Sequence, residues 1–579
     1  MSGNSPTLVL CRAAAASLLL CSLAPALAHV DADSKPPAPG DLRSAGAIDF
    51  PISCSPAVQA EFNRGVALLH SFFYEEARNI FTKVAAQDPA CAMAQWGIAQ
   101  SWWHPIWAPP APDEMKAGTA AAQQAMALAS AGRERLFIEA INAYYSAPSP
   151  KVEGEAGQSC HGPIGPRDRV VAYEAAMKKL YDAHRKDLEA QVGYAFAVLS
   201  VGYATPLDRT LAKQKEAGAM LEKLWKKHRK HPGIAHYIIH SYDYPELAAQ
   251  ALDAANAYAE IAPWVPHALH MPSHIHTRLG MWDEAIAGNA AAAQAQSSYS
   301  KLQGRTAMDT QQLHALDYMM YSYLQQARDA EARKVLDQVV AVGATFPETD
   351  FVGAYALAAV PARFALERNA WQEAARLPVA SRRQWEANPF TEGLLEYARA
   401  LGRVRTGDVA GARKAIGRMA ALRDATTDVR FAYFKKHLEL QLQAASAWIA
   451  HAEGRADEAV TSLRAAAEAE DALGKHPVTP GALVPAREQL GELLLTLKRP
   501  QEALAAYETA LKIYPARFNG LYGAALSAER SGNAKAARRH YRQLAQQAAK
   551  SDTLRTELTH AREYLAANPA PSLSARASP

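Results

Sequence analysis

A short phrase recurs along this chain and restricts its fold more than any other feature. It consists of a turn, an aromatic or polar pair, and then Glu-Ala, and it appears at 73–77, 281–285, 370–374, 455–459 and 499–503. Recurrence of this kind indicates a repeat array, in which each unit buries its apolar stripe only against its neighbours. The text is rich in Ala, Leu, Glu, Arg and Gln, so we expect the units to be helical.

The residues around the phrase resemble the tetratricopeptide repeat (TPR). The last copy follows Gly491 and continues with Tyr507, Ala510 and Pro515, and the first copy has Gly65, Ala77, Phe81 and Pro89 at matching positions. In TPR proteins the small residues let the two helices of a pair pack closely, and the proline ends the second helix. The resemblance implies an all-α, right-handed TPR-type superhelical solenoid of antiparallel helix pairs, without a sheet.

The phase of the repeat divides the chain. Units of 34 residues are predicted at 58–91, 92–125, 232–265, 266–299, 313–346, 355–388, 393–426, 440–473, 484–517 and 518–551. We expect a signal peptide at 1–28, a leader segment at 29–57, N-terminal TPR units at 58–145, a Pro-, Gly- and Ser-rich loop at 146–168, central His-rich TPR units at 169–346, C-terminal TPR units at 347–567 and a disordered tail at 568–579.

The first 28 residues have the pattern of an export signal. Arg12 provides a positive charge, 13–23 an apolar core, and 26–28 an A-x-A cleavage site. We therefore expect a mature chain from His29 that is periplasmic or secreted. No later segment is long and apolar enough for a transmembrane segment. A net charge of +4 gives no reason to expect a nucleic-acid partner.

Three cysteines, Cys54, Cys91 and Cys160, remain after cleavage. In an oxidising compartment an odd number favours one pair and one free thiol. Cys54 and Cys91 lie at nearly equivalent points of adjacent units, so we expect a disulfide that staples the N-terminal cap of the solenoid. Cys160 lies in the loop and is expected to be free.

Histidines concentrate in one part of the chain: of 19 in total, eight lie between residues 228 and 276. His236 and His240 return 34 residues later as His270 and His274, at positions 5 and 9 of their units, and His267 adds position 2. These positions lie within about 60° of arc on a helix and away from its packing positions. In TPR proteins they line the concave groove.

The next unit, phased on Ala332, adds to the same groove. It places His314, Asp317 and Tyr321 at positions 2, 5 and 9, while Asp243 and Arg278 occupy positions 12 and 13 of the two preceding units. The predicted metal ligands are therefore His236, His240, His270, His274, His267, Asp243, His314 and Asp317. Tyr321 and Arg278 are predicted to line the groove beside them. For Asp243, Asp317 and Tyr321 the alternative to direct ligation is a role as outer partners that fix the imidazole tautomers.

The sequence around these histidines is similar to a group of exported bacterial TPR proteins with a His-rich central region. The matching stretches are 88–97, 231–240 and 267–274. The resemblance implies a fold and the place of a site, without a reaction.

Two His-x-x-x-His pairs on neighbouring helices form an arrangement that a transition metal needs, because each pair presents two imidazoles on one face. Histidines and carboxylates without a thiolate suit Zn, Cu, Fe or Mn, and the sequence does not choose among them. The alternative is a hydrogen-bonded polar groove or a seat for an anion. Pro272 either kinks the helix that carries the second pair or marks a late start of that helix near Ser273.

A second pair at 34 residues, His70 and His104, is accompanied by Trp96 and Trp103. Together they suit the entrance of a ligand groove in which an organic or peptide ligand stacks. The alternative is aromatic packing beneath the proline-rich loop at 105–112.

Several chemistries lack their motifs. Neither histidine pair reads His-Glu-x-x-His, and the chain has no P-loop, no G-x-G-x-x-G after a strand and no G-x-S-x-G. Two functions remain. One is a solenoid that binds a protein, peptide or small-molecule ligand in its concave groove and carries a His-rich metal site. The other is a metal-dependent enzyme, which an ion with an open coordination position would favour.

Overall fold

The structure, a computed structural model, describes Met1 and residues 45–106, 109–147, 167–205, 208–379 and 383–569. Nearly all of the predicted signal peptide, most of the loop at 146–168 with Cys160, and most of the tail lie outside the described residues. Within them the secondary structure is α-helical apart from two 3-10 helices, η2 (Pro56–Val58) and η3 (Val429–Phe431), and one pair of two-residue strands.

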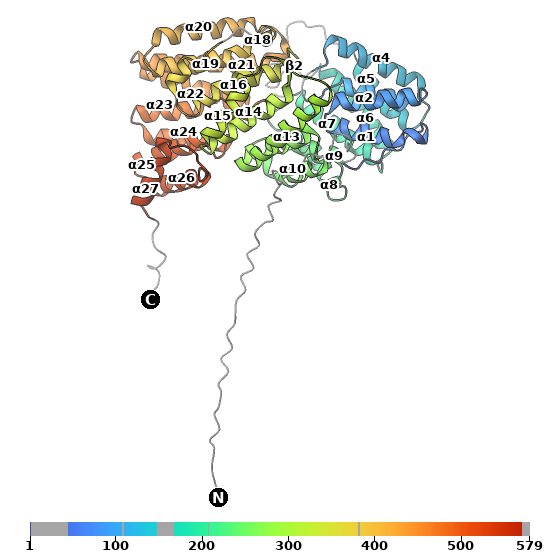
Figure 1. Cartoon of the computed structure of the whole chain (residues 1–579), viewed down its shortest axis with the longest axis horizontal. Coiled ribbons are helices and arrows are strands. Elements are labelled where there is room, and N and C mark those ends of the chain that lie inside the picture. The colour runs from blue at the N-terminus through green and yellow to red at the C-terminus, as the bar shows by residue number, and fades with distance from the viewer. Residues whose placement is uncertain (2–44, 107–108, 148–166, 206–207, 380–382, 570–579) are drawn as a thin grey trace. The chain divides into compact units, whose positions relative to one another are not determined.

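The helices follow one another as hairpins (Figure 1). The N-terminal ones are α1 (Gln59–His70), α2 (Tyr74–Gln87), α3 (Ala92–Trp102), α4 (Pro112–Leu128) and α5 (Arg133–Ser146). The central ones are α6 (Arg167–Ala183), α7 (Leu188–Tyr203), α8 (Ala212–Trp225), α9 (Pro232–Tyr242), α10 (Ala248–Ile261), α11 (Pro266–His270), α12 (Pro272–Leu279), α13 (Trp282–Leu302), α14 (Thr310–Gln325) and α15 (Asp329–Val340).

The C-terminal helices are α16 (Phe351–Leu366), α17 (Trp371–Ala375), α18 (Arg383–Ala387), α19 (Pro389–Arg405), α20 (Val409–Ala425), α21 (Ala432–Ala452), α22 (Ala456–Leu473), α23 (Ala486–Thr496), α24 (Pro500–Ile513), α25 (Phe518–Arg530), α26 (Ala534–Gln547) and α27 (Thr556–Ala567). Helices that are consecutive in the chain pack on each other, as α1 does on α2 and α25 on α26. The chain is all-α, with its helices packed pairwise as a TPR-like superhelix.

The turn between the two helices of a unit recurs at one position of the repeat. The fifteenth residue has a positive φ in nine of the ten predicted units, namely Phe72, Ile106, Gly280, Ala327, Asn369, Gly407, Gly454, Lys498 and Gly532. Glycine occupies four of these sites because it adopts left-handed backbone without a Cβ clash. The helix-turn-helix period thus follows the phase that the sequence indicates.

Small residues in the first helices make room for one aromatic ring in the second. A Cβ on Gly65 would lie 2.7 Å from the ring of Phe81, and one on Gly97 in the next unit 2.4 Å from the same ring. Gly491 and Gly523 approach Tyr507 in the same way. One ring therefore locks two successive units together, which is the packing that the TPR resemblance implies.

The expectation of a structure without a sheet is wrong in one detail. Strands β1 (Met308–Asp309) and β2 (Thr345–Phe346) pair in parallel over two residues each. β1 precedes α14 and β2 follows α15, so the strand pairing connects the insertion before α14 to the chain after α15. Backbone groups at the two ends of that hairpin are satisfied by each other, since no helix continues there.

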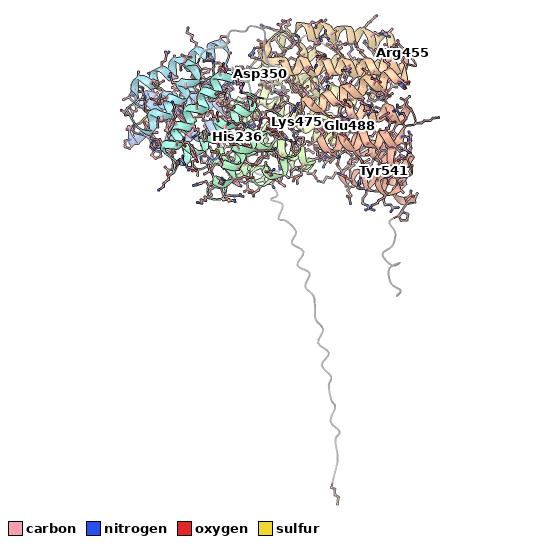
Figure 2. The ribbon with its side chains drawn as sticks, turned by 180° about the vertical axis from the view of Figure 1, so that it is seen from behind. His236, Asp350, Arg455, Lys475, Glu488 and Tyr541 are labelled. Atoms are coloured by element: carbon pink, nitrogen blue, oxygen red, sulfur yellow. A yellow bond between two sulfur atoms is a disulfide. The ribbon has the colours of Figure 1, made fainter. Side chains whose placement is uncertain are left out.

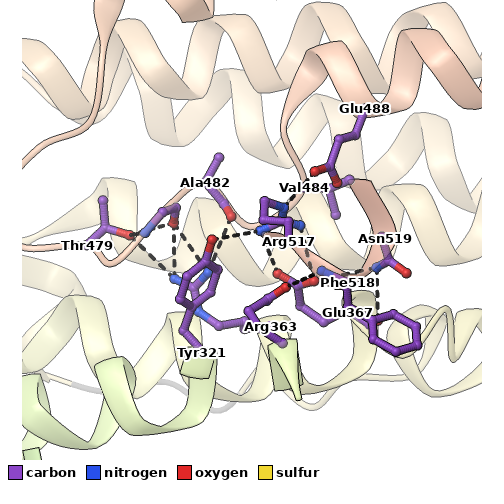
Figure 3. A network of polar contacts seen from close by, with 12 residues as sticks. Tyr321, Arg363, Glu367, Thr479, Ala482, Val484, Glu488, Arg517, Phe518 and Asn519 are labelled. Carbon is purple, nitrogen blue, oxygen red and sulfur yellow. Dashed lines mark hydrogen bonds and ion pairs between the residues drawn. The ribbon is translucent and has the colours of Figure 1, made fainter. Parts of the chain in front are cut away.

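A non-helical segment between α22 and α23 is buried against the middle of the chain. Tyr318 of α14 donates its hydroxyl to the carbonyl of Pro477 at 3.0 Å, and the Arg363 guanidinium donates to the carbonyls of Gly481 and Ala482 at 3.3 Å. Arg517 pairs with Glu488 at 2.7 Å beside this segment (Figure 3). These contacts join the C-terminal repeats to the helix that carries His314.

A disulfide joins Cys54 and Cys91, whose Cα atoms are 5.0 Å apart, and this is the pair expected from their repeat positions. It links the segment before α1 to the start of α3, at the end of the array where one neighbour is missing. No described helix combines the length and the apolar character needed to cross a bilayer.

Candidate functional site

Six of the predicted histidines gather in two groups of three. His236, His240 and His267 form triad A, and His270, His274 and His314 form triad B. Within each triad one ring nitrogen of every histidine lies within 4.8 Å of the others. A tetrahedral ion with Zn–N or Cu–N bonds of about 2.0–2.1 Å needs its ligand nitrogens about 3.4 Å apart, which small side-chain movements would achieve.

Four helices supply these side chains. Helix α9 carries His236 and His240 one turn apart, and α14 carries His314. Helices α11 and α12 carry the other three histidines and meet at Met271, which keeps helical dihedrals of φ −55° and ψ −36°. Pro272 therefore kinks a helix that begins at Pro266, because its ring nitrogen has no hydrogen to donate. The late start near Ser273 does not occur.

Triad B has its lone pairs aimed inward. The Nδ1 of His270 lies 2.6 Å from Oδ1 of Asn289, whose Nδ2 donates to the carbonyl of Ala285 at 2.7 Å. Oδ1 must then be the acceptor, so His270 carries its proton on Nδ1. The Nδ1 of His274 likewise donates to Oδ2 of Asp243 at 2.9 Å. Both Nε2 atoms are left as bare lone pairs, and they face each other at 3.0 Å.

Two lone pairs at that distance repel unless a cation lies between them. A shared proton would make either His270 or His274 an imidazolium, and burial lowers the pKa of His270 well below its ordinary value. Burial lowers the pKa of His274; the Asp243 carboxylate opposes this shift, while the positive charges of Lys475 and Arg278 add to it, and the net pKa is below the ordinary value. The neutral tautomers are therefore favoured, and a metal ion is the cation that suits them.

In triad A, too, a histidine carries its proton on Nδ1 and its lone pair on Nε2. The Nδ1 of His236 donates to the backbone carbonyl of His70 at 2.7 Å, which leaves Nε2 as the lone pair. Among the described residues, Nε2 of His236 and Nε2 of His240 are buried without a hydrogen-bond partner. Such orphaned atoms are rare in folded proteins unless a ligand completes them. Burial lowers the pKa of His236 to about 3 and holds the imidazole neutral.

The two triads are neighbours. The rings of His267 and His270 are 6.2 Å apart between centroids, and those of His240 and His274 are 6.5 Å apart. The sequence-based prediction brought the nitrogens of the two His-x-x-x-His pairs within reach of a shared or neighbouring metal. The structure divides the six histidines between two neighbouring triads, because the second pair turns to meet His314 of α14 while the first pair meets His267.

An ionic cluster supports triad B from outside. Asp243 accepts from Nε of Arg278 at 2.8 Å and lies 3.6 Å from Nζ of Lys475. Burial opposes ionisation of Asp243, but Lys475, Arg278 and His274 outweigh it and hold its pKa well below the usual value. The carboxylate therefore stays ionised and orients His274. Figure 2 labels Lys475 and, on α9, His236.

Four other predicted site residues lie outside the triads, and one of them, Asp243, is an outer partner that fixes a histidine tautomer, which is the alternative to direct ligation that the sequence offered. Asp243 orients a histidine and is not in either triad, and Arg278 is its partner. Asp317 pairs with Arg363 at 3.1 Å, and the Tyr321 hydroxyl lies 3.3 Å from Nη1 of Arg517. Both side chains point toward the C-terminal repeats, because α14 is covered on that side by the segment that precedes α23.

Five of the six triad histidines are buried. His236, His240, His270, His274 and His314 are 0–4 % exposed, and only His267 is partly exposed. The repeat places these histidines on the face of the hairpin opposite its packing face. Helices α1 and α14 and the segment around Lys475 cover the face that carries the histidines. The five buried histidines therefore do not face a peptide on the surface, whereas His267 is partly accessible.

A third cluster, His70, Glu189 and His231, is complete without a metal. Nε2 of each histidine donates to the Glu189 carboxylate, at 2.9 and 3.0 Å. The remaining Nδ1 atoms accept from the Tyr237 hydroxyl at 2.9 Å and from the backbone N–H of Ile234 at 3.3 Å. With every lone pair engaged, this cluster is structural, and it holds the His70 carbonyl under His236.

Three of the other four predicted groove residues line a cavity, and one does not. His70, Trp96 and Trp103 line one aromatic cavity, whereas the ring of His104 packs on Tyr74 at 4.5 Å and does not line that cavity. The aromatic packing that the sequence left as an alternative is thus also present.

Sequence reasoning missed Asn289, Phe72 and Lys475. Asn289 is a lone polar residue within the Ala/Gly run 287–293 of α13, a signal that could have been used. Phe72 and Lys475 lie in a turn and in a non-helical segment, and the repeat pattern says nothing about the contacts of such segments.

The neutral histidines make the metal-free protein acid-sensitive. In the unfolded chain each histidine has a pKa near 6.5. In the folded chain burial lowers the pKa of His236 to about 3 and lowers the pKa of the other five triad histidines as well. Burial also lowers the pKa of His276, outside the triads, to about 4. Below pH 6.5 the unfolded state binds more protons, so stability falls by up to about 1.4 kcal/mol per pH unit for each histidine.

Urea midpoints measured on metal-free protein at pH 7.5, 6.5, 5.5 and 4.5 test this expectation. We expect the urea midpoint to stay level above pH 6.5 and to decline steeply below it. Burial raises the pKa of Asp309 to about 6, so this group stabilises the folded state as the pH falls, but its effect is smaller than that of the histidines. A midpoint that stays level down to pH 5 would show that these histidines are not buried in neutral form.

Comparisons with known proteins agree with the repeat assignment. Residues 484–517 match the family model for the tetratricopeptide repeat, with the bounds of the ninth predicted unit. No curated protein matches the chain by sequence.

Solved structures similar to this chain include yeast Tom70, at 10% identity, covering 88% of this chain and 96% of that one with a TM-score of 0.31. Human IFIT1, solved as a dimer with PPP-AAAA, has 12% identity, covers 88% and 93%, and has a TM-score of 0.35. The P58(IPK) TPR domain has 15% identity, covers 65% and 99%, and has a TM-score of 0.21. At these scores the likenesses say nothing about the site.

Proposed function

We propose that this TPR repeat protein binds two transition-metal ions, one in each histidine triad, and acts as a metal-dependent enzyme outside the cytoplasm. The observation that carries the proposal is the pair of Nε2 lone pairs of His270 and His274, 3.0 Å apart, with both Nδ1 protons committed to Asn289 and Asp243. Fixing the tautomer through Nδ1 is what outer partners do at metal sites.

Charge balance favours copper, and copper(I) in particular. The triads contain six neutral imidazoles, and the nearby charged groups are one carboxylate, Asp243, and two cations, Lys475 and Arg278. Two divalent ions would bury four more positive charges beside an already positive cluster, at a large desolvation cost. Two monovalent ions halve that charge, and imidazole is a good ligand for copper.

The number of ligands favours catalysis over a structural role. A structural ion is closed by four protein ligands, whereas each triad supplies three and leaves a position for an exogenous molecule. The burial of the histidines disfavours the other hypothesis, a solenoid that holds a peptide partner along this face. A protein partner on another face of the array stays a prediction of the TPR resemblance.

Two features support a location outside the cytoplasm. Residues 1–28 have the pattern of an export signal. The Cys54–Cys91 disulfide is of the kind that persists in an oxidising compartment. We infer a periplasmic or secreted protein.

Elemental analysis of the chain from His29 onward, purified without a His-tag and incubated with copper(I) or Zn²⁺, tests the proposal. We expect two copper ions per chain. X-ray absorption at the copper edge should then give three nitrogen ligands per ion at about 2.0 Å.

A chain that binds neither metal would contradict the proposal and leave the hydrogen-bonded polar interior as the answer. Four nitrogen or oxygen ligands from protein per ion would contradict the catalytic part, because no position would stay open.

A further inference from the structure

An aromatic cavity of about 50 Å³ lies next to triad A. Its lining includes His70 and Phe72 of the first unit, with Phe50, Trp96, Trp103 and Phe196 among the aromatic walls. Two of these residues also belong to the surroundings of the triad. The His70 carbonyl accepts the Nδ1 proton of His236, and the Phe72 ring packs on the triad itself.

Phe72 separates the cavity from the triad. Its ring centroid lies 4.4 Å from that of His236, 5.5 Å from His240 and 5.7 Å from His267. The residue has φ +54° at the repeat turn where four other units have glycine.

Two residues of the cavity lining carry a hydrogen-bond donor that has no partner in the described part of the chain. Trp96 is 5 % exposed, and its Nε1 is buried without an acceptor; the Tyr74 hydroxyl is buried in the same condition. Both residues line the cavity. The ionised group on the wall, Glu189, is already engaged by His70 and His231. An indole N–H can only donate, so its missing partner is an acceptor.

Size and polarity define the ligand. An apolar cavity of about 150 Å³ holds benzene, and one water occupies about 30 Å³, so this cavity has room for about two or three heavy atoms. Its walls are aromatic, and a charged ligand would lose its hydration without a counter-ion.

We propose that this cavity binds a small uncharged molecule with one hydrogen-bond-accepting atom, and that it is the entry site through which such a molecule reaches the ion in triad A. Trp96 donates its Nε1 proton to the acceptor atom, and Phe72 is the barrier between cavity and ion. The role of the cavity as an entry site rests on the proposed function, whereas the binding site itself does not.

The cavity is tested first on metal-free protein with xenon, an uncharged probe of suitable size. ¹²⁹Xe NMR or diffraction from xenon-pressurised crystals should place one atom beside Trp96, and Val66→Phe, which adds a ring to the lining, should abolish it. Val66→Ile is the milder variant if the first does not fold. Acetonitrile, which carries an acceptor, should bind several-fold more weakly to Trp96→Phe, while xenon binds it unchanged.

The route is tested on the copper(I) protein with carbon monoxide, by rebinding after flash photolysis. We expect Phe72→Ala to speed rebinding by about tenfold or more, which corresponds to about 1.4 kcal/mol off the barrier. Phe73→Ala is the matched control, because the Phe73 ring packs on Trp264 and Tyr299 and does not line the cavity.

The outcomes separate the two proposals. Absence of xenon from the cavity overturns the binding site whether or not copper binds. Xenon binding with carbon monoxide rates that Phe72→Ala leaves unchanged overturns the route. Failure of copper to bind contradicts the proposed function and the route together, while the xenon and acetonitrile results still decide the binding site.

Discussion

His274→Ala should reduce the bound copper from two ions per chain to one. The variant removes one of three ligands from triad B and leaves triad A, whose histidines lie on α9 and α11, intact. His236→Ala should give the same stoichiometry by emptying triad A. The residual ion then has a different environment in each variant, and X-ray absorption or the infrared band of bound carbon monoxide distinguishes the two.

Folding should survive the loss of His274, because Asp243 keeps Arg278 and Lys475 as partners and is not left as an unpaired buried charge. His276→Ala is the matched control. His276 is also a buried histidine of α12, but its Nε2 bonds to Oδ1 of Asn256 at 3.1 Å and it belongs to no triad. It should keep both ions. Loss of both ions in His274→Ala would show one shared site, and retention of both would refute the ligand assignment.

Arg517→Met should lower the free energy of unfolding by about 3–5 kcal/mol, the usual cost of breaking a buried ion pair from one side. Arg517 is 0 % exposed and pairs with Glu488 at 2.7 Å and with Glu367 at 2.8 Å (Figure 3). Methionine fills much of the volume but leaves two buried carboxylates without their cation. Urea unfolding followed by circular dichroism at 222 nm measures the change.

Arg418→Met provides the comparison for that variant. Arg418 makes two hydrogen bonds of 2.7 Å to Glu392, yet its side chain is 52 % exposed. Water screens this pair, so we expect a loss of only about 0–1 kcal/mol. Equal effects of the two variants would contradict the view that burial, and not the number of hydrogen bonds, decides the cost.

The repeat was readable from sequence because each unit is specified locally. Gly65, Gly97 and Phe81 stand at fixed spacings, and the turn at the fifteenth position needs only its own backbone conformation. The same local rule predicted the pairing of Cys54 with Cys91 and the helical register of His236 and His240. It also predicted that Pro272 disturbs its helix, although the choice between a kink and a late start required coordinates.

The sequence by itself determined the all-α repeat, its phase, and the set of histidines that share one face. Helical periodicity decides which residues share a face, and a strong repeat makes that periodicity unambiguous. The tertiary structure alone decided how the six histidines divide into two triads. It also decided that Asp317 turns away to Arg363, and that five of the six histidines are buried. These outcomes depend on contacts between residues far apart in the chain, such as His236 with His70 and Asp243 with Lys475, which no local spacing encodes.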